Sequence, residues 1–334
     1  MLAQTQSTTR KKVLVFRELP IDQLARLQER HDVIVANPRV AAELSAFSAA
    51  LSTTHGMIGS SYPIGPDLLD RAPRLEVISS VSAGVDNYDL PALAARGITL
   101  CHTPGVLTET TADAIFSLIM ASSRRLVELA NLVREGRWTR NIGDELFGWD
   151  VHGKTLGILG FGRIGRALAR RAALGFGMPV LYHNLQAVDV ASDLPELLGK
   201  ACPTSLDELL QRSDIVAVAV PLTNETRGLM GAREFGLMKP GAIFVNGARG
   251  AIVQEEALLH ALDHGKLRAA GLDVFSVEPM PPDSPLRTHP KVTALPHIGS
   301  ATLETRRAMA ALATSNLLDA LAARQPVGLF TLPS

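Results

Sequence analysis

Three polar side chains that can carry out acid–base and anion chemistry each stand shortly after an apolar, β-rich run in the second half of the chain. They are Arg249, Glu278 and His297. An arginine holds a carboxylate with a planar fork of donors and polarises a neighbouring ketone. A histidine can protonate an oxygen near neutral pH, and a carboxylate beside it favours the charged imidazole. This set of residue types is suited to the reduction of a 2-oxo acid.

The runs that precede these residues predict neighbouring strands of one parallel sheet. In an open parallel sheet, ligands bind outside the carboxyl ends of the strands, so side chains that follow different strands reach one crevice. We therefore expect the three candidate side chains to lie together at that edge. The strands expected in this part of the chain are Leu156–Leu159, Val180–His183, Ile215–Val220, Ala242–Asn246, Ala270–Phe275 and Val292–Leu295.

A glycine fingerprint follows the first of these strands. The apolar run Thr155–Leu159 continues into Gly160-Phe161-Gly162-Arg163-Ile164-Gly165 and then into a helical pattern over Arg166–Leu174. In such a unit the first glycine permits a tight turn, the second lets the backbone approach a pyrophosphate, and the third lets the helix pack against the strand. The helix N-terminus offers unpaired N–H groups to the phosphates. The fingerprint predicts a dinucleotide site beside the candidate catalytic residues.

A second alternation of strands and helices precedes the fingerprint, and it predicts another parallel sheet flanked by helices. We expect Thr108 to cap a long helix that runs to about Arg125. A last helix, Thr302–Ala323, has apolar residues all round, so we expect it to be buried on the first unit. The fold class is thus α/β, with two doubly wound parallel sheets. The strands expected in the first unit are Val13–Phe16, Val33–Val35, Met57–Ile58, Val77–Val81 and Ile98–Leu100.

Composition and charge exclude several classes of protein. The chain has 334 residues, 46% of them apolar, with 33 basic and 33 acidic side chains, which excludes a disordered chain and a global basic field for nucleic acid. Cys101 and Cys202 suggest neither a metal site nor a redox pair, which fits a reducing compartment. Met1–Lys12 lacks the apolar core of a signal peptide, and the densest apolar run, Ala114–Ala121, is too short for a membrane span. We expect a cytoplasmic protein without membrane or nucleic-acid partners.

Between Ser79 and Ser300 the chain closely resembles the D-isomer-specific 2-hydroxyacid dehydrogenases. The resemblance implies a Rossmann-type cofactor domain over 103–299, inserted in a discontinuous, flavodoxin-like substrate domain over 1–102 and 300–334. The matching blocks occur in the order and at the spacing of that family: Ser82-Ala83-Gly84-Val85-Asp86, Gly105-Val106-Leu107-Thr108, the glycine fingerprint, Pro221-Leu222-Thr223, Asn246-Gly247-Ala248-Arg249-Gly250, Gly271-Leu272-Asp273-Val274-Phe275, Glu278-Pro279 and Pro296-His297-Ile298-Gly299-Ser300.

The resemblance also implies an activity and roles for individual residues. It implies that NAD(P)H reduces a 2-oxo acid of the glyoxylate/hydroxypyruvate class to the D-2-hydroxy acid, in a homodimer embraced by Asn131–Asp150. Arg249, Glu278 and His297 would be catalytic, and backbone N–H groups at Ala83 and Gly84 would join Arg249 and His297 in holding the substrate. The cofactor contacts would be Gly160, Phe161, Gly162, Arg163, Ile164, Gly165, His183, Asn184, Val220, Pro221, Thr226, Gly247, Ala248, Asp273 (at the nicotinamide carboxamide), His297 and Gly299.

The choice between NAD(H) and NADP(H) depends on the segment after the second strand of the cofactor unit. It reads Tyr182-His183-Asn184-Leu185-Gln186. No carboxylate stands where it would bind a ribose 2′-hydroxyl or repel a 2′-phosphate, since Asp189 comes a little late. This absence favours NADP(H), whereas the absence of an arginine or lysine leaves NAD(H) open.

Two other classes of protein have chains similar to this one. Corepressor-like, NAD(H)-sensing binding proteins share this fold and keep the catalytic set, so the set alone does not exclude a binding protein. Against it, the chain has no disordered tail and no basic arm. Formate dehydrogenases would have Gln-Pro before the catalytic histidine, which Leu295-Pro296-His297 does not match. The particular 2-oxo acid depends on the loop Gly59–Tyr62 and stays open.

Overall fold

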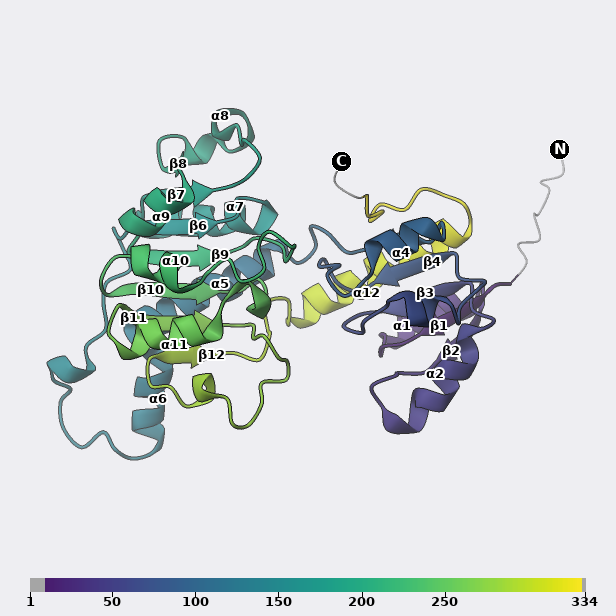
Figure 1. Ribbon diagram of the computed structural model, residues 1–334, viewed down its shortest axis with the longest axis horizontal. Helices are drawn as coiled ribbons and strands as arrows, with labels where there is room; N and C mark the ends of the chain where they lie inside the picture. Colours follow the sequence, from purple (N-terminus) through teal and green to yellow (C-terminus); the bar gives the residue numbers. More distant parts are fainter. Residues whose placement is uncertain (1–9, 332–334) are drawn as a thin grey trace. The chain divides into compact units, whose positions relative to one another are not determined.

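The structure, a computed structural model, describes residues 10–331 and divides into two units, each with its own parallel sheet (Figure 1). Unit 1 comprises Met1–Leu107 with Thr302–Ser334, and unit 2 comprises Thr108–Ala301. The sequence analysis placed the boundaries slightly earlier, at 102/103 and 299/300. Residues 1–9, on which the signal-peptide expectation depends in part, lie outside the described residues. Of the helices that the structure describes, none is long and apolar enough to cross a membrane.

The sheet of unit 1 has five parallel strands in the order β2-β1-β3-β4-β5. This is the 2-1-3-4-5 order of flavodoxin-like folds, so the predicted fold class is confirmed for this unit. The bounds agree with the predicted strands to within one residue, because short β-branched runs between polar turns are a strong strand signal. The strands are β1 (Lys12–Val15), β2 (Asp32–Val35), β3 (Gly56–Gly59), β4 (Val77–Ser80) and β5 (Thr99–Cys101).

Helices cover the sheet of unit 1. The helices α2 (Leu44–Leu51), α3 (Pro66–Leu69) and α4 (Leu90–Ala95) share one apolar core with the strands. The helix α1 (Ile21–Gln28) packs against α12 (Leu303–Leu321), which contacts β3, β4 and β5. The hydroxyl of Ser79 on β4 donates a hydrogen bond of 2.8 Å to the backbone oxygen of Ala313 on α12. The last helix therefore packs on the first sheet, as the sequence predicted.

The sheet of unit 2 has seven parallel strands in the order β12-β11-β10-β9-β6-β7-β8. The strand β8, a three-residue edge strand that ends in a proline, was not predicted from the sequence. The strand β11 was predicted three residues late, because the apolar run through Phe275 continues after the chain has left the sheet. The strands are β6 (Leu156–Leu159), β7 (Val180–His183), β8 (Ala201–Pro203), β9 (Ile215–Val218), β10 (Ala242–Asn246), β11 (Leu267–Leu272) and β12 (Val292–Ala294).

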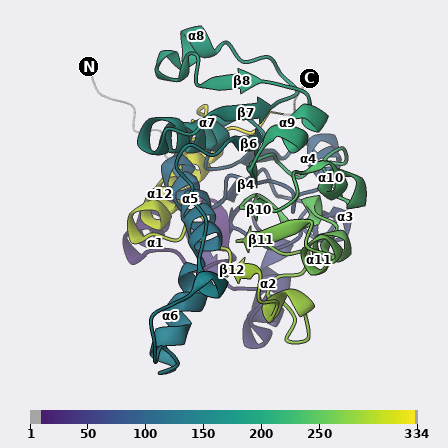
Figure 2. The same cartoon turned by 90° about the vertical axis from the view of Figure 1, so that its left-hand side faces the viewer.

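Helices cover both faces of this second sheet, as Figure 2 shows. One core contains apolar side chains of α5 and α7, and a separate core on the opposite face contains those of α9, α10 and α11. Two predicted helix starts were wrong. Thr108 is the first residue of α5 and not its cap, and α7 begins at Arg163 because Gly162 is its N-cap. The helices are α5 (Thr108–Arg124), α6 (Leu126–Arg134), α7 (Arg163–Arg170), α8 (Val190–Asp193), α9 (Leu206–Arg212), α10 (Ala232–Leu237) and α11 (Glu255–Asp263).

Candidate active site

The carboxyl edge of the unit 2 sheet gathers most of the residues that the sequence analysis selected. The order of the strands reverses between β6 and β9, and ligands of open parallel sheets bind outside the strand ends at such a switch point. The selected residues at this edge are Gly160 after β6, His183 and Asn184 at the end of β7, Val220 and Pro221 after β9, Gly247–Arg249 after β10, Asp273 and Glu278 after β11, and His297 and Gly299 after β12.

Glu278 and His297 are in direct contact. Nδ1 of His297 lies 2.7 Å from Oε2 of Glu278, and Oε1 of Glu278 accepts the backbone N–H of Phe275 at 3.0 Å. Burial raises the pKa of Glu278, but the hydrogen bonds from His297 and Phe275 and the charges of His297 and Arg249 outweigh it and hold the pKa below its usual value. The carboxylate therefore stays ionised, orients the ring and leaves Nε2 for a reacting group.

Asp273 holds the loop that carries His297. Its two carboxylate oxygens accept the backbone N–H groups of Ile298 at 2.7 Å and Gly299 at 2.8 Å, and its side chain is buried. His297 itself adopts a positive φ of 54°, a conformation that side-chain-bearing residues adopt only under local constraint. Both oxygens of Asp273 thus position the loop of the imidazole, and the contact with the nicotinamide carboxamide that the resemblance implies stays a prediction.

Arg249 stands at the end of a turn that Asn246 organises. The buried amide of Asn246 donates to the backbone oxygen of Arg249 at 2.9 Å and accepts the N–H of Ala248 at 3.0 Å. The next residue, Gly250, lies so close to Phe275 that a Cβ would be 1.9 Å from the backbone carbon there. The loops after β10 and β11 are thus packed backbone to backbone, which fixes Arg249 near Glu278.

The glycine loop has the geometry of a phosphate cradle. Gly160 has a φ of +98°, and a Cβ there would be 2.7 Å from backbone atoms of Ala219, so only glycine fits. A Cβ at Gly162 would meet nothing within 4 Å, and this residue caps the helix that begins at Arg163. The backbone is therefore open where the N-terminal N–H groups of α7 point outward, as a bound pyrophosphate requires.

We expect opposite phenotypes from alanine at two of these glycines. Gly162→Ala should leave the free energy of unfolding nearly unchanged, because its backbone is unstrained and its Cβ enters open space, yet it should weaken cofactor binding more than about 10-fold. At Gly165, a Cβ would be 2.1 Å from the carbonyl oxygen of Gly160, so Gly165→Ala should lower stability by about 1–3 kcal/mol. Chemical denaturation and fluorescence titration measure both. Normal cofactor affinity in Gly162→Ala would contradict the cradle.

Two residues of the fingerprint region have roles that the sequence did not reveal. The ring of Phe161 is buried and stacks on that of Tyr182, with centroids 3.8 Å apart, so its side chain belongs to the core. Its backbone N–H donates to the side-chain oxygen of Asn184 at 3.0 Å, and the amide of Asn184 donates to the backbone oxygen of Gln186. Asn184 thus joins the end of β7 to the glycine loop. The position of Asn184 directly after a predicted strand was the sequence signal available for this role.

The remaining predicted cofactor and substrate contacts divide between the units. In unit 2, the hydroxyl of Thr226 donates to the backbone oxygen of Pro221 at 2.7 Å and closes the loop after β9. In unit 1, Ala83 and Gly84 follow β4, and the backbone oxygen of Ala83 lies 2.9 Å from Nδ1 of His102. Because each unit is described by itself, contact between Ala83, Gly84 and the catalytic residues stays a prediction.

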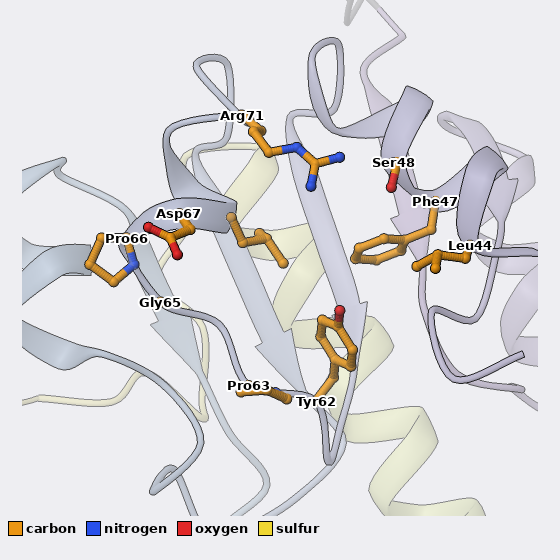
Figure 3. A pocket seen from close by; sticks show the side chains of 10 residues that line it. Leu44, Phe47, Ser48, Tyr62, Pro63, Gly65, Pro66, Asp67 and Arg71 are labelled. Carbon is orange, nitrogen blue, oxygen red and sulfur yellow. The ribbon is translucent and has the colours of Figure 1, made fainter. Parts of the chain in front are cut away.

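The loop after β3, which the sequence analysis connected with substrate choice, borders a cavity of about 390 Å³ in unit 1. Figure 3 shows the hydroxyl of Tyr62 and the guanidinium of Arg71 pointing toward the cavity, which the ring of Phe47 also lines. The rings of Phe47 and Tyr62 meet edge to face with centroids 5.6 Å apart. This contact packs Tyr62, at the end of the loop, against Phe47 of α2. Ser60 and Ser61 directly follow β3 and therefore lie at the carboxyl edge of the sheet.

A parallel sheet with a glycine cradle at its switch point and an imidazole–carboxylate pair at the same edge defines a nucleotide-dependent dehydrogenase. Comparison with known proteins agrees. The family model described as "D-isomer specific 2-hydroxyacid dehydrogenase, NAD binding domain" matches residues 116–299. Glyoxylate/hydroxypyruvate reductase B of Citrobacter koseri is 48% identical over 310 residues, which cover 92% of this chain and 94% of that protein.

Solved structures lead to the same family. A protein from Thermus thermophilus has a TM-score of 0.86 at 44% identity, covering 96% of this chain and all of that one. The NADPH-dependent glyoxylate/hydroxypyruvate reductase of Sinorhizobium meliloti, solved with NADP and malonate, has a TM-score of 0.85 at 32% identity, covering 97% of each chain. The chain belongs to the D-isomer-specific 2-hydroxyacid dehydrogenase family.

Proposed function

We propose that this protein reduces a small 2-oxo acid of the glyoxylate/hydroxypyruvate class to the D-2-hydroxy acid with NAD(P)H. The observation that carries the proposal is the 2.7 Å contact between His297 and Glu278 at the edge where the glycine cradle opens. Relatives at 48% identity that bear the name glyoxylate/hydroxypyruvate reductase support it. A panel of 2-oxo acids with NADH and NADPH tests it by kcat/KM, and absence of turnover with every acid would favour a corepressor-like binding protein.

The chain's own groups have defined tasks in this reaction. The reduced nicotinamide, when bound, supplies the hydride, and the N–H groups at the start of α7 hold its pyrophosphate. Nε2 of His297 donates a proton to the substrate oxygen, while Glu278 keeps the ring oriented and favours its charged form. Arg249 binds the substrate carboxylate and polarises the ketone, and the backbone N–H groups of Ala83 and Gly84 bind the same carboxylate.

Removing the charge of Glu278 should move the pH dependence of reduction. Reduction consumes a proton that His297 donates in the proposed mechanism, so kcat/KM should fall as the pH rises. The Glu278 carboxylate, ionised because its pKa is held low, favours the protonated ring, so Glu278→Gln should make the ring lose its proton more readily. The decline in kcat/KM should therefore begin at a lower pH than in the wild type. An unchanged pH–rate profile would remove Glu278 from the proton-donating pair.

The cofactor preference should be modest and easy to shift. His183 binds the backbone oxygen of Thr204 through Nδ1, and Leu185 is an apolar side chain that is 88% exposed. Neither residue therefore offers a fixed charge to the ribose. We expect NADPH to be favoured less than about 100-fold, a difference under ~3 kcal/mol. His183→Asp should shift the ratio of kcat/KM toward NADH by repelling a 2′-phosphate, and Leu185→Arg toward NADPH. Wild-type discrimination beyond a thousandfold, or an unmoved ratio in His183→Asp, would contradict this account.

We further propose a homodimer built mainly on the cofactor domain, with Asn131–Asp150 in the embrace, in a cytoplasmic protein. In this region Val133, Trp138 and Phe147 are between 48% and 59% exposed, and exposed apolar side chains of this size are typical of an interface. Light scattering of the wild type and of Trp138→Glu measures the mass, and a monomeric wild type would exclude the dimer. The domain boundaries 1–102, 103–299 and 300–334 are proposed with the same family arrangement.

A further inference from the structure

Two arginines of unit 1 converge on the loop after β3. Arg17 follows β1, and its guanidinium donates to the hydroxyl of Ser60, a buried residue directly after β3. Arg39 follows β2, and its guanidinium donates to the backbone oxygen of Ser61. Both therefore lie at the carboxyl edge of one sheet, where the strand order places the ends of β2, β1 and β3 side by side.

A third guanidinium adds to the positive charge at this edge. Arg306 lies in the first turn of α12, the helix that packs on β3 and β4, and its charge acts on Arg17 together with that of Arg39. Burial, and then the charges of Arg306 and Arg39, lower the pKa of Arg17, and burial lowers that of Arg306. The positive end of the α12 dipole faces the same edge.

None of these three guanidiniums has an acidic partner among the residues that the structure describes, in contrast to Arg10 and Arg96 of the same unit. Arg10 pairs with Asp32 at 2.9 Å, and Arg96 pairs with Asp70. Within residues 10–331, the guanidinium of Arg17 donates only to a serine hydroxyl, and that of Arg39 only to a backbone oxygen. Like charges held together in a partly buried place repel each other, and an anion among them removes this repulsion. Ser60, whose oxygen accepts from Arg17, keeps a hydroxyl proton to donate to such an anion.

We propose that Arg17, Arg39 and Arg306 bind a second acidic group, a carboxylate or a phosphate, at the distal end of the substrate. The inference rests on the proposed function, which places the 2-oxo acid carboxylate at the N–H groups after β4. The arginine site follows β1 and β3 at the same edge of the same sheet, on the other side of Ser60. Among small 2-oxo acids of the same chain length, one with an acidic group at each end is then reduced more efficiently than the monoacid.

Matched pairs of substrates isolate the distal charge. We would compare 2-oxoglutarate with 2-oxopentanoate, and oxaloacetate with 2-oxobutyrate, by kcat/KM. The wild type should prefer the diacid of a pair about 10- to 100-fold, because charge-assisted hydrogen bonds to guanidinium are strong. Arg39→Gln should reduce this diacid-to-monoacid ratio at least about 10-fold, and since Arg39 is exposed, the variant should fold. Arg74→Gln, an exposed arginine of the same unit, is the control and should keep the wild-type ratio.

A binding measurement separates this inference from the proposed function. Succinate has two carboxylates and no ketone, and butyrate has one, so calorimetry measures the anion site without turnover. If 2-oxo acids are reduced but the diacid-to-monoacid ratio and succinate affinity are the same in wild type and Arg39→Gln, the arginine site is overturned and the activity stands. If no 2-oxo acid is reduced and succinate still binds through Arg39, the activity is wrong and the anion site stands.

Discussion

His297→Ala should lower kcat for the reduction of hydroxypyruvate by about 100- to 10,000-fold, the contribution of a positioned general acid. The variant loses the only group in the proposed set that carries a transferable proton to the substrate oxygen. Because His297 lies in a loop held by Asp273 and its side chain is 44% exposed, the truncation should leave the fold and the glycine cradle intact. Steady-state kinetics with saturating NADPH measures the loss.

Two controls make this result specific. Cofactor affinity of His297→Ala, titrated by fluorescence, should stay within a few-fold of the wild type. His152→Ala removes an exposed imidazole of the same unit and should leave kcat unchanged. If His297→Ala retains turnover within a few-fold of the wild type, His297 is not the proton donor and the proposed mechanism is wrong.

Arg249→Lys should reduce kcat/KM by about 10- to 100-fold although the charge is kept, because one or two charge-assisted hydrogen bonds are lost. Both kcat and KM should change, since the guanidinium that binds the carboxylate also polarises the ketone. The turn around Arg249 depends on backbone groups held by Asn246, so the lysine should not disturb it.

A matched substitution separates this loss from a general effect of replacing arginine. Arg233 is exposed and pairs with Asp207 and Glu234 on the surface of unit 2, so Arg233→Lys should keep wild-type kinetics. Wild-type kcat/KM in Arg249→Lys would remove this residue from the substrate site.

Much of the fold follows from sequence because the strands are short, apolar and separated by turn residues. In unit 1 the predicted strands agree with the observed ones to within one residue. The exceptions have physical causes. The edge strand β8 is held by a single neighbour and has no apolar run of its own. At β11 the apolar pattern continues to Phe275, but the strand has already ended there, because the backbone N–H of Phe275 donates to the side chain of Glu278 and not to a neighbouring strand.

The candidate catalytic residues could be predicted from the sequence because parallel strands bring the residues after them to one edge. The residues that position them could not be predicted, since their roles depend on three-dimensional contacts. The hydrogen bonds from two backbone N–H groups to Asp273 and the hydrogen bond from Phe161 to Asn184 join residues that are 23 to 26 positions apart in the chain. Substrate choice is less predictable still, because Arg17 and Arg39 come together only once β1, β2 and β3 are ordered in the sheet.

The central claim is that the protein transfers a hydride to C2 of a 2-oxo acid and gives the D-product. The most direct test is incubation with hydroxypyruvate and reduced nicotinamide cofactor that carries deuterium at both C4 positions, followed by chiral chromatography and mass spectrometry. We expect D-glycerate with one deuterium at C2, and at least about 100-fold less of it from His297→Ala at matched times. The absence of labelled glycerate from the wild type, or labelled glycerate of the L form, would contradict it.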